Sequence, residues 1–388
     1  MTDTNKSVSD FTRREMLAAG SLAVGSVALS GRWPTEATAA DSSEPIQGFS
    51  TYQQLLDAIT QKGHKLHTLG YCHDGSPVVA VKVGGDKTPA IFISAGSHST
   101  EHAGPLAAID LLDSLQTDHA VYVIPCRDPM GLQGFRHVLG FGLGAEPDVS
   151  TMKDVEALLR KEGEILYDAE GRLLVLIGDY GYANTGFHQK VEKGARFLDP
   201  LKGRRLYFPS NDPQAPGAGP LQRAYTQIVT PDGEVLHINR FHDTAWAPVE
   251  VRCTRNLMAE VNPGLVFDLH EYGGSDFWMS ARRQKTDEDE IWERRLAHEA
   301  VQAVVAGGGT LASEEYSPGS FFDKLEPGVF WLDASKRGEG LNLADFSAKK
   351  YGLAFTIETG MRQPFAKRIG MHRAVVQSAV RVFEERYA

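Results

Sequence analysis

Apolar and polar positions along the chain follow two spacings, one typical of helices and one typical of strands. Apolar residues three or four positions apart predict amphipathic helices, at about 49–62, 106–112, 152–162, 249–261, 288–305 and 364–387. Short apolar runs rich in β-branched residues predict strands, at 78–83, 90–96, 121–125, 173–177, 265–270 and 355–358. Because helices alternate with short strands, we expect an α/β fold with a mixed, mostly parallel central sheet flanked by helices.

The same pattern divides the chain into segments. Residues 1–39 have the features of an export signal, residues 40–64 those of a polar linker followed by an N-terminal helix, and residues 65–388 those of the α/β domain. From about 143 to 236 the regular spacing gives way to loops rich in Gly, Pro and Asn, apart from one helix and one strand. We therefore expect an insertion on the domain at about 143–236.

Three signals occur in the order expected of a twin-arginine signal peptide. Arg13 and Arg14 precede an apolar run of small residues at 17–30, and Ala37-Thr38-Ala39 matches a small-x-small cleavage site. The run is too short and too rich in Ala, Gly and Ser to span a bilayer stably, which argues against a stable membrane anchor. The sequence predicts export by the twin-arginine machinery to the periplasm or the medium.

The net charge and the number of cysteines limit which partners and which metal ligands can be expected. The 388 residues are 42% hydrophobic and 23% charged, as in ordinary globular proteins, and the formal net charge is -10. A negative chain disfavours nucleic acid as a partner. Three cysteines do not make a disulfide framework, so a metal site would use His and carboxylate ligands.

Candidate chemistry begins directly after the strand predicted at 90–96. His98 and Glu101 stand three residues apart in a turn that leads into a helix, at the end of a strand where open α/β sheets bind ligands. This spacing lets an imidazole nitrogen and a carboxylate oxygen approach one ion at about 2.0–2.2 Å. Alternatively, the pair is a polar helix start, with Glu101 against the helix dipole. His102, four residues after His98, is a less favoured ligand.

Two further polar residues end predicted strands. His270 ends the strand 265–270, and Asp268 lies on the same face, where it can orient a histidine ligand or form a structural pair with it. Glu358 ends an apolar strand, which desolvates its carboxylate and raises its pKa towards the range of a general base. One rim of one sheet could therefore gather His98, His270 and Glu358, the parts of a hydrolytic zinc site.

Five motifs occur in the order in which zinc carboxypeptidases carry them, and the chain resembles that family over most of residues 65–388. The similar stretches are Gly96-Ser97-His98-Ser99-Thr100-Glu101, Pro125-Cys126-Arg127-Asp128-Pro129-Met130-Gly131, Ile238-Asn239-Arg240-Phe241, Phe267-Asp268-Leu269-His270, and Asn342-Leu343-Ala344-Asp345-Phe346 with Glu358. The resemblance implies a zinc carboxypeptidase-like catalytic domain, related in fold to succinylglutamate desuccinylase and aspartoacylase.

The resemblance also implies roles for single residues. His98, Glu101 and His270 would bind one Zn²⁺ ion per chain. Glu358 would activate water and later protonate the leaving amine. These four residues would make up the metal and proton-transfer centre.

Substrate contacts are implied in the same way. Asn239 and Arg240 would hold a carboxylate by charge-assisted hydrogen bonds, and Arg136, which follows the Asp-Pro-Met-Gly turn, would polarise the scissile carbonyl. The chain departs from the family where a tyrosine usually covers the substrate, because Lys336 and Arg337 occupy that neighbourhood. Basic residues bordering the pocket would favour acidic substrate groups.

The function expected from this sequence is that of an exported zinc-dependent hydrolase that cleaves an amide or peptide bond next to a free carboxylate. Its substrate would be a peptide or an N-acyl amino acid. One alternative is an N-acyl amino acid deacylase of the desuccinylase and aspartoacylase type, which also begins with a His-x-x-Glu motif. A second alternative is a binding module that keeps the fold without the chemistry.

Overall fold

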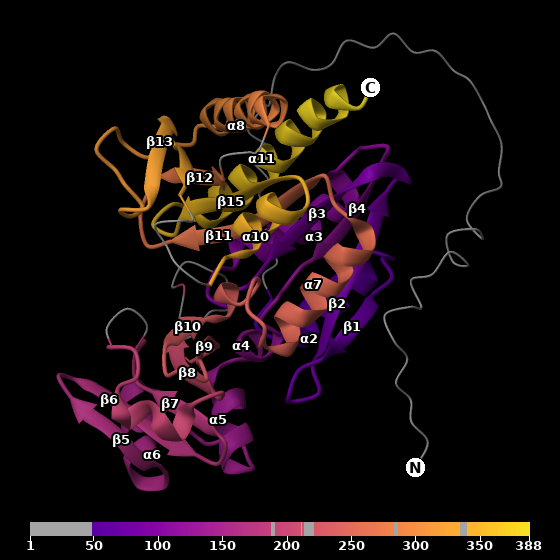
Figure 1. Cartoon of the computed structure of the whole chain (residues 1–388). Helices are drawn as coiled ribbons and strands as arrows, with labels where there is room; N and C mark the ends of the chain where they lie inside the picture. Colours follow the sequence, from indigo (N-terminus) through magenta and orange to yellow (C-terminus); the bar gives the residue numbers. More distant parts are fainter. Residues whose placement is uncertain (1–48, 188–190, 211, 213–220, 283–285, 334–339) are drawn as a thin grey trace. The chain divides into compact units, whose positions relative to one another are not determined.

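The computed structural model describes residues 49–187, 191–210, 212, 221–282, 286–333 and 340–388 (Figure 1). The export signal predicted at 1–39 lies outside the described residues and stays a prediction. Lys336 and Arg337 also lie outside them. In the part of the chain that is described, no helix combines the length and the apolarity that a membrane crossing requires.

A sheet of nine strands forms the main body. In spatial order its strands are β1 (His67–Tyr71), β2 (Pro77–Gly84), β4 (His119–Ile124), β3 (Lys87–Ala95), β11 (Leu265–Tyr272), β15 (Leu353–Gly360), β12 (Phe277–Arg282), β14 (Val329–Leu332) and β13 (Phe322–Glu326). The four central strands β4, β3, β11 and β15 are parallel, and the strands on either side include antiparallel pairs. The mixed α/β fold expected from the sequence is confirmed.

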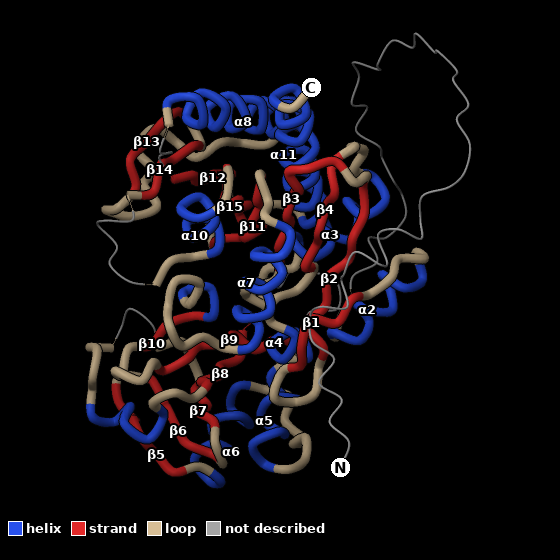
Figure 2. Tube along the Cα trace, turned by 45° about the vertical axis from the view of Figure 1, so that its right-hand side comes forward, coloured by secondary structure: helices blue, strands red, loops and turns tan. Residues whose placement is uncertain are grey.

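Helices cover both faces of this sheet (Figures 1 and 2). One face packs apolar side chains of alternate strand positions, such as Ile93, Leu269 and Ile357, against four helices in a continuous core. These helices are α2 (Tyr52–Gln61), α3 (Ala103–Ser114), α8 (Asp287–Ala306) and α11 (Phe365–Arg386). The other face carries α7 (Val249–Val261) and α10 (Leu343–Lys350). The polar side chains of the candidate site belong to this second face.

Residues 143–236, expected to be largely irregular, hold most of a second sheet. Its order is β10 (Val235–His237), β9 (Arg223–Val229), β8 (Arg205–Ser210), β7 (Tyr180–Ala183), β6 (Arg172–Ile177) and β5 (Glu164–Ala169). The helices α4 (Pro129–Gln133), α5 (Phe135–Leu143) and α6 (Met152–Glu162) precede its strands along the chain. The short 3-10 turn η2 (Arg196–Leu201) lies between β7 and β8, and η3 (Ile238–Arg240) follows β10. The expectation of loops was wrong at β7, β8 and β9, because strands of four to seven residues between Gly and Pro leave little periodicity to detect.

Candidate metal and catalytic site

A tight turn after β3 delivers the first candidate ligand. Gly96 adopts φ 62°, and a Cβ there would lie 3.0 Å from the Cα of Cys126, so the turn requires glycine. The backbone N–H of Glu101 donates to the carbonyl of His98 over 3.1 Å and closes the next turn. His98 and Glu101 are thereby fixed at the carboxyl end of the central strands.

The structure brings the three predicted ligands together. His98 Nδ1 lies 2.6 Å from Glu101 Oε1, and His270 Nδ1 lies 2.8 Å from Glu101 Oε2. One ligand atom from each residue lies within 4.8 Å of the others, which makes this group one that could hold a metal ion. Burial opposes ionisation of Glu101, but the two histidines outweigh it and lower its pKa to about 2. Two imidazoles and an ionised carboxylate are the donor set of a catalytic zinc site with one open position.

Glu358 stands beside this group on the next strand. It is the register partner of His270 across the parallel pair β11 and β15, so both side chains leave the same face of the sheet. Burial raises the pKa of Glu358 to about 8, with the charge of Glu101 adding to the effect. Its Oε2 is buried and has no hydrogen-bond partner. A buried carboxylate oxygen with nothing to bind is suited to taking a proton from a reactant.

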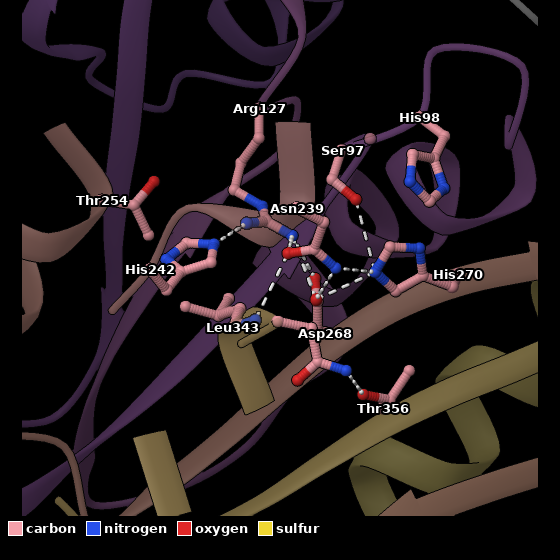
Figure 3. A network of polar contacts seen from close by, with 12 residues as sticks. Ser97, His98, Arg127, Asn239, His242, Thr254, Asp268, His270, Leu343 and Thr356 are labelled. Carbon is pink, nitrogen blue, oxygen red and sulfur yellow. Dashed lines mark hydrogen bonds and ion pairs between the residues drawn. The ribbon is translucent and has the colours of Figure 1, made fainter. Parts of the chain in front are cut away.

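A buried polar network contacts His270 at Nε2, the ring nitrogen that does not face Glu101 (Figure 3). His270 Nε2 lies 2.9 Å from Asp268 Oδ2 and 3.0 Å from Asn239 Nδ2. Arg127 Nη2 contacts both oxygens of Asp268, at 2.8 and 3.0 Å, and its Nη1 donates to Nε2 of His242 over 2.8 Å. Burial alone would raise the pKa of Asp268, but Arg127 and then His270 lower it below its usual value. The carboxylate is therefore ionised and faces the outer nitrogen of the candidate ligand.

His98 takes its outer partners from the second sheet. Its Nε2 lies 2.8 Å from Nδ1 of His237 on β10, and its ring stacks on Tyr225 of β9 with centroids 5.0 Å apart. Burial raises the pKa of Tyr225 well above its usual value, and the charges of Glu101 and Glu358 add to this. Neither His237 nor Tyr225 was predicted from the sequence. The one available signal was that His237 lies two residues before Asn239, which was itself a candidate.

Two residues that the sequence suggested for the site, Arg136 and His102, do not contact the ligand group among the described residues. Arg136, assigned to the scissile carbonyl, is exposed on α5 and donates through Nε to the carbonyl of Pro147 over 3.3 Å. Among the described residues, no hydrogen bond or ion pair joins Arg136 to the ligand group, whereas the guanidinium of Arg127 binds Asp268, the carboxylate next to His270. His102 accepts at Nε2 from Arg223 over 2.6 Å and is therefore bound away from the group.

The Asn-Arg pair divides between two environments. Asn239 is 3% exposed, and its amide is bound within the protein on both sides. Arg240 is half-buried, and its Nη1 is buried without a hydrogen-bond partner. Of the two, the guanidinium of Arg240 is the group that still needs an acceptor.

Aromatic rings lie beyond Glu358. Trp278 is its register partner on β12, and Trp278 packs against Tyr272 and Tyr316 with ring centroids 6.0 and 6.2 Å apart. The charge of Glu358 is among the causes that raise the pKa of Tyr316 to about 12, after burial and Tyr272. Tyr272 and Tyr316 thus lie close enough to Glu358 for its charge to act on both.

Comparisons with known proteins give matches among solved structures. No model of a known family matches the sequence, and no curated protein matches it. Matches include a provisionally named metallopeptidase from Shewanella amazonensis, at 17% identity over 85% of this chain and 91% of the other, with a TM-score of 0.44. A metallo-carboxypeptidase from Burkholderia cenocepacia has 10% identity over 87% and 69%, with a TM-score of 0.46. Bovine thrombin-activatable fibrinolysis inhibitor has 13% identity over 87% and 98%, with a TM-score of 0.47. Because these sequence identities are so low, the chemistry of this chain has to be argued from its own residues.

Proposed function

We propose that this protein is a zinc-dependent hydrolase that cleaves an amide bond next to a free carboxylate. The observation that carries the proposal is the position of Glu358, in register with His270 and with a buried, unpartnered oxygen. A general base needs such an oxygen within reach of the reacting water, and a raised pKa increases its affinity for the proton.

His98, Glu101 and His270 would hold the metal. When bound, zinc supplies a Lewis acid for the scissile carbonyl and lowers the pKa of water. Glu358 accepts a proton from the attacking water at Oε2 and later delivers it to the leaving nitrogen. A cation close to Glu358 lowers the pKa of this carboxyl, so the base is ionised at a lower pH in the loaded protein.

Arg240 is the candidate for the substrate carboxylate. Its buried, unpartnered Nη1 favours an anion, since a guanidinium binds carboxylates through charge-assisted hydrogen bonds. We propose a peptide with a free C-terminus or an N-acyl amino acid as substrate, and export of the protein by the twin-arginine route.

Metal analysis and kinetics test the proposal. Wild-type protein is expected to hold one zinc ion per chain, and His270→Ala to lose it. Glu358→Gln is expected to keep the metal while kcat falls about 10²–10⁴-fold, the usual contribution of a general base. Each protein is assayed on a C-terminally free blocked dipeptide and on an N-acyl amino acid.

The control is Glu314→Gln on the surface, which is expected to act as wild type. Full zinc retention in His270→Ala would remove this residue from the site. Unchanged turnover in Glu358→Gln would exclude the proposed role of the base.

A further inference from the structure

The amide of Asn239 is engaged at both ends inside the protein. Its Oδ1 accepts from Arg127 Nη2 over 2.9 Å and from the backbone N–H of Leu343 over 3.3 Å. Its Nδ2 donates to Asp268 Oδ2 over 3.0 Å. Because the two acceptor contacts come from obligate donors, the orientation of the amide is fixed by its partners.

The remaining contact of the amide faces His270. If His270 binds metal through Nδ1, its Nε2 carries the proton and donates to Asp268 Oδ2, 2.9 Å away. Asn239 Nδ2 then lies against the ring at 3.0 Å while its hydrogen bond goes to the same carboxylate oxygen. Asn239 is 3% exposed, and its Nδ2 contacts both Asp268 and His270.

We propose that Asn239 is a positioning residue for His270 rather than a contact for the substrate. It ties three parts of the chain together: Arg127 after β4, Asp268 on β11 and Leu343 at the start of α10 (Figure 3). Asp268, held on both oxygens in this way, fixes the ring orientation and the tautomer of His270. Of the Asn-Arg pair, Arg240 is then the residue left to recognise the substrate carboxylate. The inference rests on the proposed metal site.

The experiment compares Asn239→Ala with wild type by competitive Zn²⁺ titration and by the visible spectrum of the Co²⁺-substituted protein. Loss of an outer-shell partner is expected to weaken zinc affinity about 10–100-fold and to shift the cobalt spectrum. At saturating zinc the KM of Asn239→Ala for a blocked dipeptide stays near that of wild type, whereas Arg240→Ala raises KM and keeps the metal affinity. A residue that grips substrate would show the opposite division.

Asn342→Ala is the matched control. Asn342 is a buried asparagine that caps α10 and donates to Thr356, and its side chain forms no hydrogen bond with Asp268 or His270 among the described residues. It is expected to keep wild-type metal affinity. Asn239→Thr, which retains an acceptor for Arg127, serves if the alanine variant does not fold, and its loss of affinity is expected to be smaller.

The outcomes separate the two proposals. Wild-type zinc affinity and cobalt spectrum in a folded Asn239 variant overturn the positioning role and leave the proposed function intact. Wild-type protein that binds no metal overturns both.

Discussion

The two imidazoles of the ligand group are supported by different parts of the molecule. His270 is 2% exposed, and its outer nitrogen faces an ionised carboxylate that is itself paired with a buried guanidinium. His98 is half-buried, and its outer nitrogen faces the ring of His237 from the second sheet. The core of the main sheet therefore fixes one candidate ligand, while the other depends on a residue of the second sheet. The difference teaches that an ionised carboxylate supports one imidazole, whereas a second imidazole and a stacked tyrosine ring support the other.

The largest effect is expected from Arg127→Ala on the charged side. Removing the guanidinium leaves Asp268 buried beside His270 without its cation, which costs about 3–5 kcal/mol in free energy of unfolding. Urea unfolding measures this. The matched control is Arg160→Ala, which breaks the exposed pair with Asp168 and is expected to stay close to wild type. Equal losses in the two variants would contradict the contrast between buried and exposed pairs.

The next effect is a dependence of stability on pH in chelator-treated protein. Burial raises the pKa of Glu358 to about 8 in the folded state, against about 4.3 in an unfolded chain. Between these values the folded protein keeps a proton that the unfolded chain has released. The free energy of unfolding therefore falls as pH rises, by up to about 1.4 kcal/mol per pH unit.

Glu358→Gln tests this effect because it has no proton to lose. Urea unfolding across the same window is expected to show a smaller slope in the variant. His270, whose pKa is raised by Asp268 and Glu101 against the effect of burial, contributes in the same direction in both proteins. Identical slopes would mean that Glu358 ionises as in water.

The smallest effect is expected on the side of the second sheet. His237→Leu removes the ring nitrogen that faces His98 and is expected to weaken zinc affinity about 10-fold. His237→Asn keeps an acceptor at the same position of the side chain and is expected to stay near wild type. Competitive Zn²⁺ titration measures both. A leucine variant with undiminished affinity would show that His98 needs no partner from the second sheet.

Sequence periodicity predicted the elements with long, clear patterns. The helices at 249–261 and 152–162 and the strands that end near His98, His270 and Glu358 all appear, because each has several apolar residues in register with a buried face. The meeting of these strand ends followed from the rule that parallel strands share a rim.

Contacts that depend on tertiary packing were not predictable in this way. Arg127 contacts Asp268, and His237 contacts His98, only because β4 and β10 end next to these residues, across more than 100 residues of chain. Single polar residues on short strands leave no periodic signal, so the role of Tyr225 was missed. The resemblance suggested a substrate role for Asn239, and its buried contacts favour a different one.

The short passage from β10 into η3 carries a wider consequence. His237 and Asn239 are two residues apart and address different imidazoles, His237 directly and Asn239 through Asp268. A small rotation of residues 237–239 would therefore change the distance between the two nitrogen donors by acting on both imidazoles together. If the group binds a metal, we therefore expect substitutions at residues 237–239 to change which ion is preferred without replacing any of the three ligands.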